Sequence, residues 1–275
     1  MLAPAPNYVK IFGFPRGLAL FATIHGPFRQ QGRQFVVRAG VRLIRLRNTA
    51  SDKSIFFQVV VKQEYETRGW PAQHARLARA YEELVRQGKT PIIIDAGANI
   101  GLASLWFAER YPRARLYAVE PDEGNLSLIR CNVAAVPNIV VLPGAVWDRA
   151  GNLRIANPDA GAGAFRVVEG AGNVRGYTIP EIVALEPNGV LFIVKIDIEG
   201  GESGLFRSNT GWTKDARLIV IELHDWLFPM EATSRNFLRC IAELPVDLLF
   251  GGENAFCFNF GESGQATDSR GVDPA

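Results

Sequence analysis

The feature that most constrains this chain is a β-branched run that ends in an acid and is followed by two glycines. Residues 92–101 read IIIDAGANIG, and an apolar helical pattern follows them. Such a run predicts a buried strand, a tight turn and a helix, since glycine accepts positive φ and has no Cβ to keep a ligand away. The spacing Asp-x-Gly-x-x-x-Gly lacks a glycine of the dinucleotide fingerprint, which argues against NAD. The turn therefore favours another nucleoside cofactor, with a purely structural glycine turn as the competing interpretation.

A second acid stands at the end of the next predicted strand. Glu120 closes the apolar run 115–120, and Pro121 stops it. An acid at this position can accept hydrogen bonds from both ribose hydroxyls of a nucleoside. The pair of strand-end acids strengthens the cofactor interpretation considerably.

Apolar runs and turn signals predict an α/β fold with a mainly parallel, seven-stranded sheet. Helices separate most of the strands, and residues 74–86 form a helix ahead of the first one. The last two strands are joined by only four residues, so they form a hairpin in which one strand is antiparallel. The predicted strands are 92–95, 115–120, 139–142, 191–197, 218–223, 246–250 and 255–260.

The segments around this sheet have a different character. Residues 35–47 and 55–61 are β-rich and predict a small N-terminal β element. Residues 157–176 are rich in Gly and Ala and predict either a mobile lid over an acceptor or a plain surface insertion. We expect an N-terminal arm and β element over 1–73, the cofactor-binding domain over 74–260 and a disordered tail over 261–275.

Composition excludes several classes of function. A net charge of +2 without a Lys/Arg block does not indicate nucleic acid binding, and three scattered cysteines do not indicate a disulfide framework. We therefore expect a cytoplasmic protein. The apolar stretches near residues 11–22 are interrupted by prolines and Arg16 and are too short to span a membrane. Packing of this arm on the domain is favoured over contact with a membrane or partner.

Four motifs resemble the FkbM-type methyltransferases, a class I group that depends on S-adenosylmethionine. The motifs are residues 94–101 (IDAGANIG), 118–122 (AVEPD) with Asn125 and Asn132, 195–202 (KIDIEGGE) and 221–225 (IELHD). They follow one another across most of the chain, and the KIDIEGGE string is the most specific of them. The resemblance implies a Rossmann-like class I methyltransferase fold. It also implies cofactor-binding roles for Asp95, Gly97, Asn99, Gly101, Glu120, Pro121 and Asp197, and position alone adds Trp147.

The chemistry of methyl transfer suggests which residues act. Asp95, Glu120, Asp197 and Glu222 all stand at strand ends, where ligands bind in open α/β sheets. A base must remove the acceptor proton, and we predict His224 for this role, with Asp197 and Glu199 as the other catalytic residues. Lys195 is expected to pair with these acids and keep them ionised. Alternatively Asp197, Glu222 and His224 collect a divalent cation such as Mg²⁺.

The leading hypothesis is an S-adenosylmethionine-dependent O-methyltransferase, as the family resemblance implies. Its acceptor would be a small molecule or glycan that offers a hydroxyl group, on a sugar, glycolipid or secondary metabolite. Two alternatives stay open: a non-catalytic nucleoside-binding module that serves as a partner subunit, and, with less support, an NAD-dependent oxidoreductase. We expect no nucleic acid partner and no transmembrane segment; a homodimer stays open.

Overall fold

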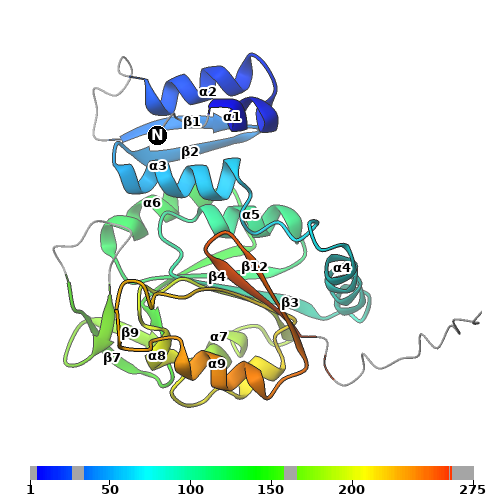
Figure 1. The fold of residues 1–275 in the computed structure, drawn as a ribbon, viewed down its shortest axis with the longest axis vertical. Helices are drawn as coiled ribbons and strands as arrows, with labels where there is room; N and C mark the ends of the chain where they lie inside the picture. Colours follow the sequence, from blue (N-terminus) through cyan, green and yellow to red (C-terminus); the bar gives the residue numbers. More distant parts are fainter. Residues whose placement is uncertain (1–4, 27–33, 158–165, 260, 262–275) are drawn as a thin grey trace, which may run out of the picture.

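The computed structural model describes residues 5–26, 34–157, 166–259 and 261. Its centre is a seven-stranded sheet in the order β12-β13-β11-β10-β3-β4-β5 (Figure 1). β13 runs antiparallel to both of its neighbours, β11 and β12, whereas the other strand pairs of this sheet are parallel, which confirms the predicted hairpin. The strands are β3 (Thr90–Ala96), β4 (Arg115–Glu120), β5 (Ile139–Pro143), β10 (Gly189–Ile196), β11 (Leu218–Glu222), β12 (Val246–Gly251) and β13 (Asn254–Asn259).

Helices cover both faces of this sheet, as its continuous apolar strands require. One face packs on α4 (Pro71–Arg86), α5 (Leu102–Arg110) and α6 (Glu123–Val133). The other packs on α7 (Ile179–Val183), α8 (Glu202–Leu205) and α9 (Arg235–Ala242), with a 3-10 turn at Gly211–Lys214. The strand order reverses between β3 and β10, and that switch point is where an open α/β sheet binds its ligand.

A small second sheet flanks the strand ends and was not predicted. It contains β6 (Ala145–Val146), β7 (Gly151–Ile155), β8 (Val167–Glu169) and β9 (Val174–Tyr177), in the order β6-β9-β7-β8. β8 and most of β9 fall within residues 157–176, so the described part of this segment belongs to a sheet and is not a mobile lid, the first of its two interpretations. Residues 158–165 lie outside the described residues, as does nearly all of the predicted tail.

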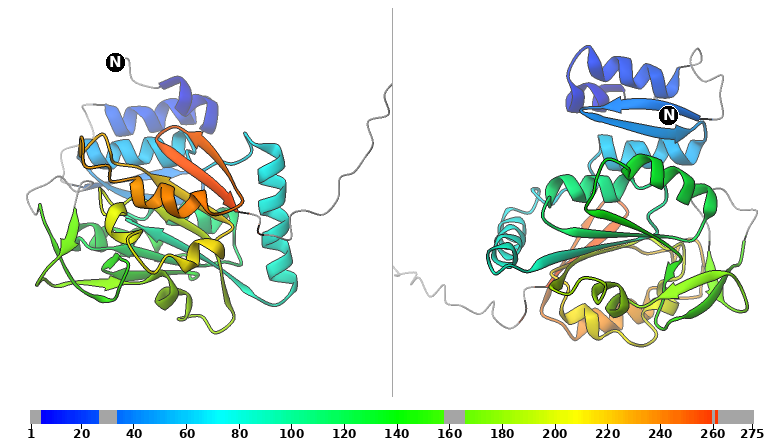
Figure 2. Two further views of the ribbon diagram at one scale, coloured as in Figure 1. Left: turned by 60° about the horizontal axis from the view of Figure 1, so that its bottom comes forward. Right: turned by 180° about the vertical axis from the view of Figure 1, so that it is seen from behind.

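The N-terminal unit forms one end of the molecule and lies above α5 and α6 (Figures 1 and 2). It contains α1 (Ala5–Phe12), α2 (Arg16–His25), the antiparallel hairpin β1 (Gln34–Ala39) and β2 (Arg42–Arg47), and α3 (Ala50–Phe56). Tyr8, Ile24, Val37 and Leu46 are buried in the same core as α4 and α5. The expected packing of the N-terminal arm on the domain is therefore what the structure has.

The prediction that residues 55–61 form a strand is wrong. The segment completes α3 and continues as a π-helical turn, Phe57–Val61. Thr49 caps α3 by accepting a hydrogen bond from the Asp52 backbone N–H, so the helix is initiated upstream of the β-branched run. Packing of Phe56 and Val59, both fully buried, then outweighs local β propensity.

The predicted boundary between residues 73 and 74 falls within α4, which begins at Pro71. Among the described residues, no helix combines the length and the apolar composition that crossing a membrane requires.

Candidate active site

The glycine turn after β3 packs against the end of β10. Gly97 and Gly101 have φ of +77° and +86°, as the sequence pattern suggested. A Cβ on Gly97 would overlap the backbone carbonyl of Asp197, and one on Gly101 would crowd the Ile129 side chain. The space beside each glycine is thus filled by the protein itself. These glycines let the turn fit tightly between β10 and α6, rather than leaving room for a ligand.

Glu120 ties the turn to the next strand. Its Oε2 accepts a 2.8 Å hydrogen bond from the Asn99 backbone N–H. Its Oε1 accepts from Asn125 Nδ2 at 3.0 Å and from the Asp122 backbone N–H at 3.1 Å. Burial raises the pKa of Glu120 to about 7, although all three hydrogen bonds oppose that change. About one of its four acceptor positions is left for a ligand.

A cleft opens beside Glu120 at the switch point of the sheet. About 560 Å³ of empty space lies in this cleft, and part of that space is open solvent. Asn99 lines it, and the buried Asn99 Oδ1 has no hydrogen-bond partner among the described residues. The predicted residues that line this cleft are Gly97, Asn99, Glu120, Pro121, Trp147, Asp197 and Glu199.

Trp147 forms one wall of the cleft and is held by the small sheet. Its Nε1 donates to Glu169 Oε1 at 3.2 Å. Asp148, the next residue in the chain, forms an ion pair with Arg207 at 3.0 Å. Asp148 therefore supports the structure beside the cleft.

Asp95, near the end of β3, and Gly101, just before α5, are not among the residues that line the cleft. Asp95 is fully buried, where Oδ2 accepts from Ser104 Oγ at 2.6 Å and Oδ1 lies 3.1 Å from Lys195 Nζ. Lys195 is directly opposite Asp95 in the parallel pairing of β10 and β3, and it also donates to the Gly97 carbonyl at 2.8 Å. Its pKa is raised, since the charges of Asp95 and Asp197 outweigh its burial. The expected pairing of Lys195 with the acids is present.

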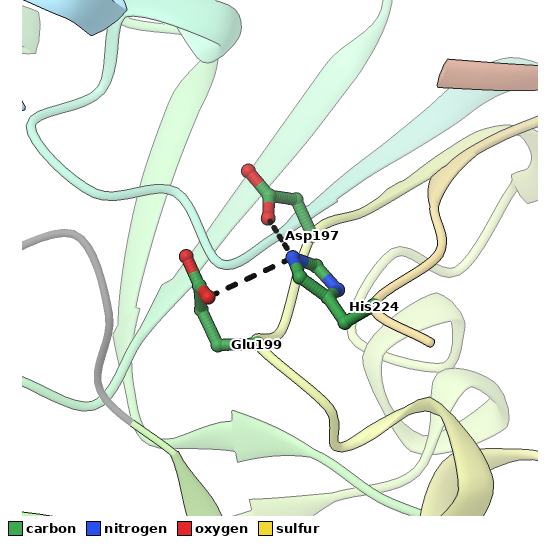
Figure 3. A group of neighbouring side chains, drawn as sticks. All are labelled: Asp197, Glu199 and His224. Carbon is green, nitrogen blue, oxygen red and sulfur yellow. Dashed lines mark ion pairs between the residues drawn. The ribbon is translucent and has the colours of Figure 1, made fainter. Parts of the chain in front are cut away.

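His224 lies among several carboxylates near the ends of β10 and β11, and Figure 3 shows two of them beside the imidazole. Its Nδ1 is 2.9 Å from Oε1 of the fully buried Glu202. Its Nε2 is 3.7 Å from Asp197, 3.6 Å from Glu199 and 3.7 Å from Glu222, beyond hydrogen-bond distance of each. One nitrogen is thus fixed by Glu202 while the other faces the acids.

These neighbours change the proton affinities of the site. Burial lowers the pKa of His224, but the hydrogen bond and charge of Glu202, with the charges of Asp197 and Glu199, raise it to about 9. Burial and the charge of Asp197 raise the pKa of Glu199 and of Glu222 to about 7, although His224 opposes this. In the absence of ligand, His224 therefore carries a positive charge at neutral pH.

The imidazole and the carboxylates around it also offer ligand atoms for a cation. One atom each of Asp197, Glu199 and His224 lie within 4.8 Å of one another. The predicted metal set had Glu222 in place of Glu199, and both acids are close to Nε2. The bond from Glu202 to Nδ1 is the arrangement that orients a metal-binding imidazole.

Two residues of this site were missing from the predicted set. Glu202 is the last acid of the KIDIEGGE string and so carried a sequence signal. Glu64 follows the π-helical turn, close enough to Lys195 and Asp197 to interact with both charges, and burial raises its pKa to about 7. Glu64 lies upstream of the four motifs, in a segment that reads Gln-Glu-Tyr at residues 63–65.

Comparison with known sequences gives a match to one family. The profile described as "Methyltransferase FkbM domain" matches residues 95–244, more than half of the chain. A 66-residue segment is 38% identical to "Methyltransferase sdnD" of Sordaria araneosa. That segment spans 23% of this chain and 26% of the relative.

Solved structures with similar folds include methyltransferases. Precorrin-6y C5,15-methyltransferase of Geobacter metallireducens has a TM-score of 0.35 and 11% identity, over 68% of this chain and 84% of that one. Aeropyrum pernix fibrillarin, solved with natively bound S-adenosyl-L-methionine, has a TM-score of 0.37 and 14% identity, over 62% and 66%. With TM-scores this low, the family assignment rests on the sequence match.

Proposed function

Because the chain belongs to the FkbM methyltransferase family, we propose that it transfers the methyl group of S-adenosylmethionine to a hydroxyl of a sugar, glycolipid or secondary metabolite. One observation carries the proposal. The cleft at the switch point is lined by Glu120 and Asp197, and Asp197 lies beside a histidine whose Nδ1 is fixed by a buried acid. The cofactor-binding cleft and the histidine that would accept the proton are then adjacent.

The cleft residues suit the nucleoside end of this cofactor. Glu120 has an acceptor position left for a ribose hydroxyl, and the unpaired Asn99 Oδ1 can accept from a second donor. Trp147 offers an aromatic wall for the base. In this proposal the role of three residues is indirect. Asp95, Gly101 and Lys195 support the cleft by holding the turn and the end of β10 together.

Bound S-adenosylmethionine supplies an activated methyl group whose carbon–sulfur bond breaks as the carbon–oxygen bond to the acceptor forms. The protein must align the acceptor and accept its proton. We assign proton acceptance to His224 Nε2. Glu202 holds the imidazole in place through Nδ1, and Asp197 and Glu199 orient the acceptor hydroxyl. His224 must first release its own proton to solvent, and a bound sulfonium would favour this release because a nearby positive charge lowers the pKa of the imidazole.

The alternative role of His224 and the carboxylates around it is to bind a divalent cation. Mg²⁺ prefers carboxylate oxygens, and Asp197, Glu199 and His224 offer three ligand atoms close together. A cation there would acidify the acceptor hydroxyl directly. His224 would then be a ligand and could not also be the base.

Titration calorimetry tests the cofactor first. We expect saturable binding of S-adenosylmethionine and S-adenosylhomocysteine and none of NAD. Glu120→Gln should weaken it, whereas Glu123→Gln, an exposed acid in the first turn of α6, should not. Repeating the titration with Mg²⁺ and with chelator separates the two roles of His224. Absence of binding under both conditions would refute the proposal.

An acceptor screen follows, read out as S-adenosylhomocysteine release. Turnover with a hydroxyl acceptor supports the proposed reaction. Tight cofactor binding without turnover on any sugar, glycolipid or metabolite would favour the non-catalytic partner module instead.

A further inference from the structure

Charge is divided unevenly along the chain. Residues 1–51 contain eight Lys/Arg and no Asp or Glu, whereas the rest contains 22 basic and 28 acidic residues, a net charge of −6. The first 51 residues include the α1–α2 pair and the β1–β2 hairpin, which together form one end of the molecule (Figure 1). The protein therefore has one positive end on a negative body.

Exposed apolar side chains gather in the same region. Of the twelve large apolar side chains that are exposed among the described residues, six lie between residues 11 and 43. Phe14, in the α1–α2 turn, is 76% exposed, and Val41, in the β1–β2 turn, is 89% exposed. The others are Ile11, Leu18, Val36 and Leu43. Single exposed apolar residues are ordinary, but such a concentration marks an interaction surface.

The two exposed turns are neighbours in space. Ile11 and Phe12 at the end of α1 line one cavity together with Ala39 and Gly40 of the hairpin turn. Phe14 and Val41 each lie within two residues of that cavity's lining, so they belong to the same end of the N-terminal unit. Lys10 and Arg16 flank Phe14 in sequence and are exposed.

The outer face of the hairpin alternates apolar and basic side chains. Val36 is opposite Arg45, and Arg38 is opposite Leu43, in the antiparallel register. All four side chains are exposed, while the intervening Val37 and Ile44 are buried. Within the described part of the chain, neither Arg38 nor Arg45 forms an ion pair with a carboxylate.

We propose that this end of the protein, the surface formed by the α1–α2 turn and the outer face of the β1–β2 hairpin, docks on an anionic lipid bilayer. Phe14 and Val41 would enter the boundary between headgroups and acyl chains, and the arginines would contact lipid phosphates. Arginine suits this position because its stem packs with apolar groups while its guanidinium stays at the phosphates. The acidic body, repelled by the same surface, would be held away from it.

The side-chain chemistry favours a bilayer over a polynucleotide. Proteins that bind single strands stack bases on several aromatic rings in a basic groove. Here the exposed apolar groups are mainly aliphatic, and the two most exposed of them, Phe14 and Val41, stand in turns, which suits interfacial insertion. The inference is independent of the proposed methyl transfer, since the surface lies on other elements than the cleft.

The test measures flotation of the full-length protein with phosphatidylcholine vesicles, with and without phosphatidylglycerol. We expect binding only to the anionic vesicles, and release as salt increases. Arg38→Glu with Arg45→Glu should lower the partition coefficient at least tenfold, because each basic charge near the surface contributes about fivefold. Phe14→Ser with Val41→Ser should lower it by about tenfold as well.

Matched controls use the same substitutions elsewhere. Arg79→Glu with Arg239→Glu changes two exposed arginines of α4 and α9, and Phe250→Ser changes a 68% exposed aromatic of β12. These variants should float like the wild type, with circular dichroism and melting temperature showing that every variant is folded. Equal binding by all variants, no binding to anionic vesicles, or binding of an RNA oligonucleotide in its place would overturn the proposal.

Discussion

The pair formed by His224 and Glu202 predicts how the stability of the ligand-free protein depends on pH. The two groups are 2.9 Å apart and both buried, and the pKa of His224 is raised from 6.5 to about 9. That difference corresponds to about 3 kcal/mol of stabilisation. A raised pKa in the folded state stabilises the protein fully below pH 6.5, and the stabilisation is lost as the pH rises through 9. We therefore expect the free energy of unfolding to fall by about 3 kcal/mol across this range.

Glu202→Gln isolates the contribution of the pair. Glutamine keeps an acceptor for the His224 Nδ1–H and nearly the same volume, but it removes the charge that most raises the histidine pKa. Its unfolding free energy should lie about 2 kcal/mol below that of the wild type at pH 6.5, and the difference should close as the pH approaches 9. Titration of Glu199 and Glu222 is common to both proteins and largely cancels.

Urea denaturation followed by tryptophan fluorescence measures this difference, at pH values from 6.5 to 9.5, with chelator and without cofactor. Glu123→Gln, which removes an exposed acid, serves as the control and should follow the wild type throughout. If the wild type and Glu202→Gln give parallel curves over the whole range, Glu202 does not hold the proton on His224 and the argument fails.

Three further predictions concern the cleft and the turn. Glu120→Gln should weaken S-adenosylmethionine binding by about 10- to 100-fold in calorimetry, because the ribose loses a charged acceptor. His224→Ala should leave the affinity for S-adenosylhomocysteine, which carries no sulfonium charge, unchanged but slow methyl transfer by about 10²- to 10⁴-fold; normal turnover would mean that another group is the base. Gly97→Ala should cost more than about 2 kcal/mol of unfolding free energy in urea, because its Cβ would overlap the Asp197 carbonyl. Gly69→Ala has open space and should cost little; similar losses for both would refute the steric explanation.

The central sheet was predictable from sequence for a physical reason. Strands such as β3 and β10 are covered on both faces, so they read as uninterrupted β-branched and apolar runs. The hairpin of β12 and β13 followed from a connection too short for a crossover. Where burial is complete and turns are short, local pattern and tertiary environment agree.

Prediction failed where the local sequence pattern and the tertiary environment disagree. Residues 55–61 have the composition of a strand, yet a cap at Thr49 and burial of Phe56 place them in a helix that continues as a π turn. The small sheet has strands of two to five residues, too short to show a period. Asp95 stands at a strand end, but its side chain is directed to Ser104 and Lys195 and does not line the cleft, an orientation that the strand pattern does not specify.

The pKa of His224 was the hardest property to predict from the sequence, because it depends on the sum of interactions with residues from separate segments. In isolation an imidazole has a pKa close to neutral, which is why it was chosen as the base. In the fold, Glu202 follows β10 while Glu222 ends β11, and together with Asp197 and Glu199 they surround the ring. The result is an imidazolium at neutral pH. If His224 is the base, the site must be activated by binding a positive charge, because only such a charge offsets the carboxylates that hold the proton. In the proposed reaction a bound sulfonium would supply such a charge, so cofactor binding would itself lower the pKa of His224 and prepare the base.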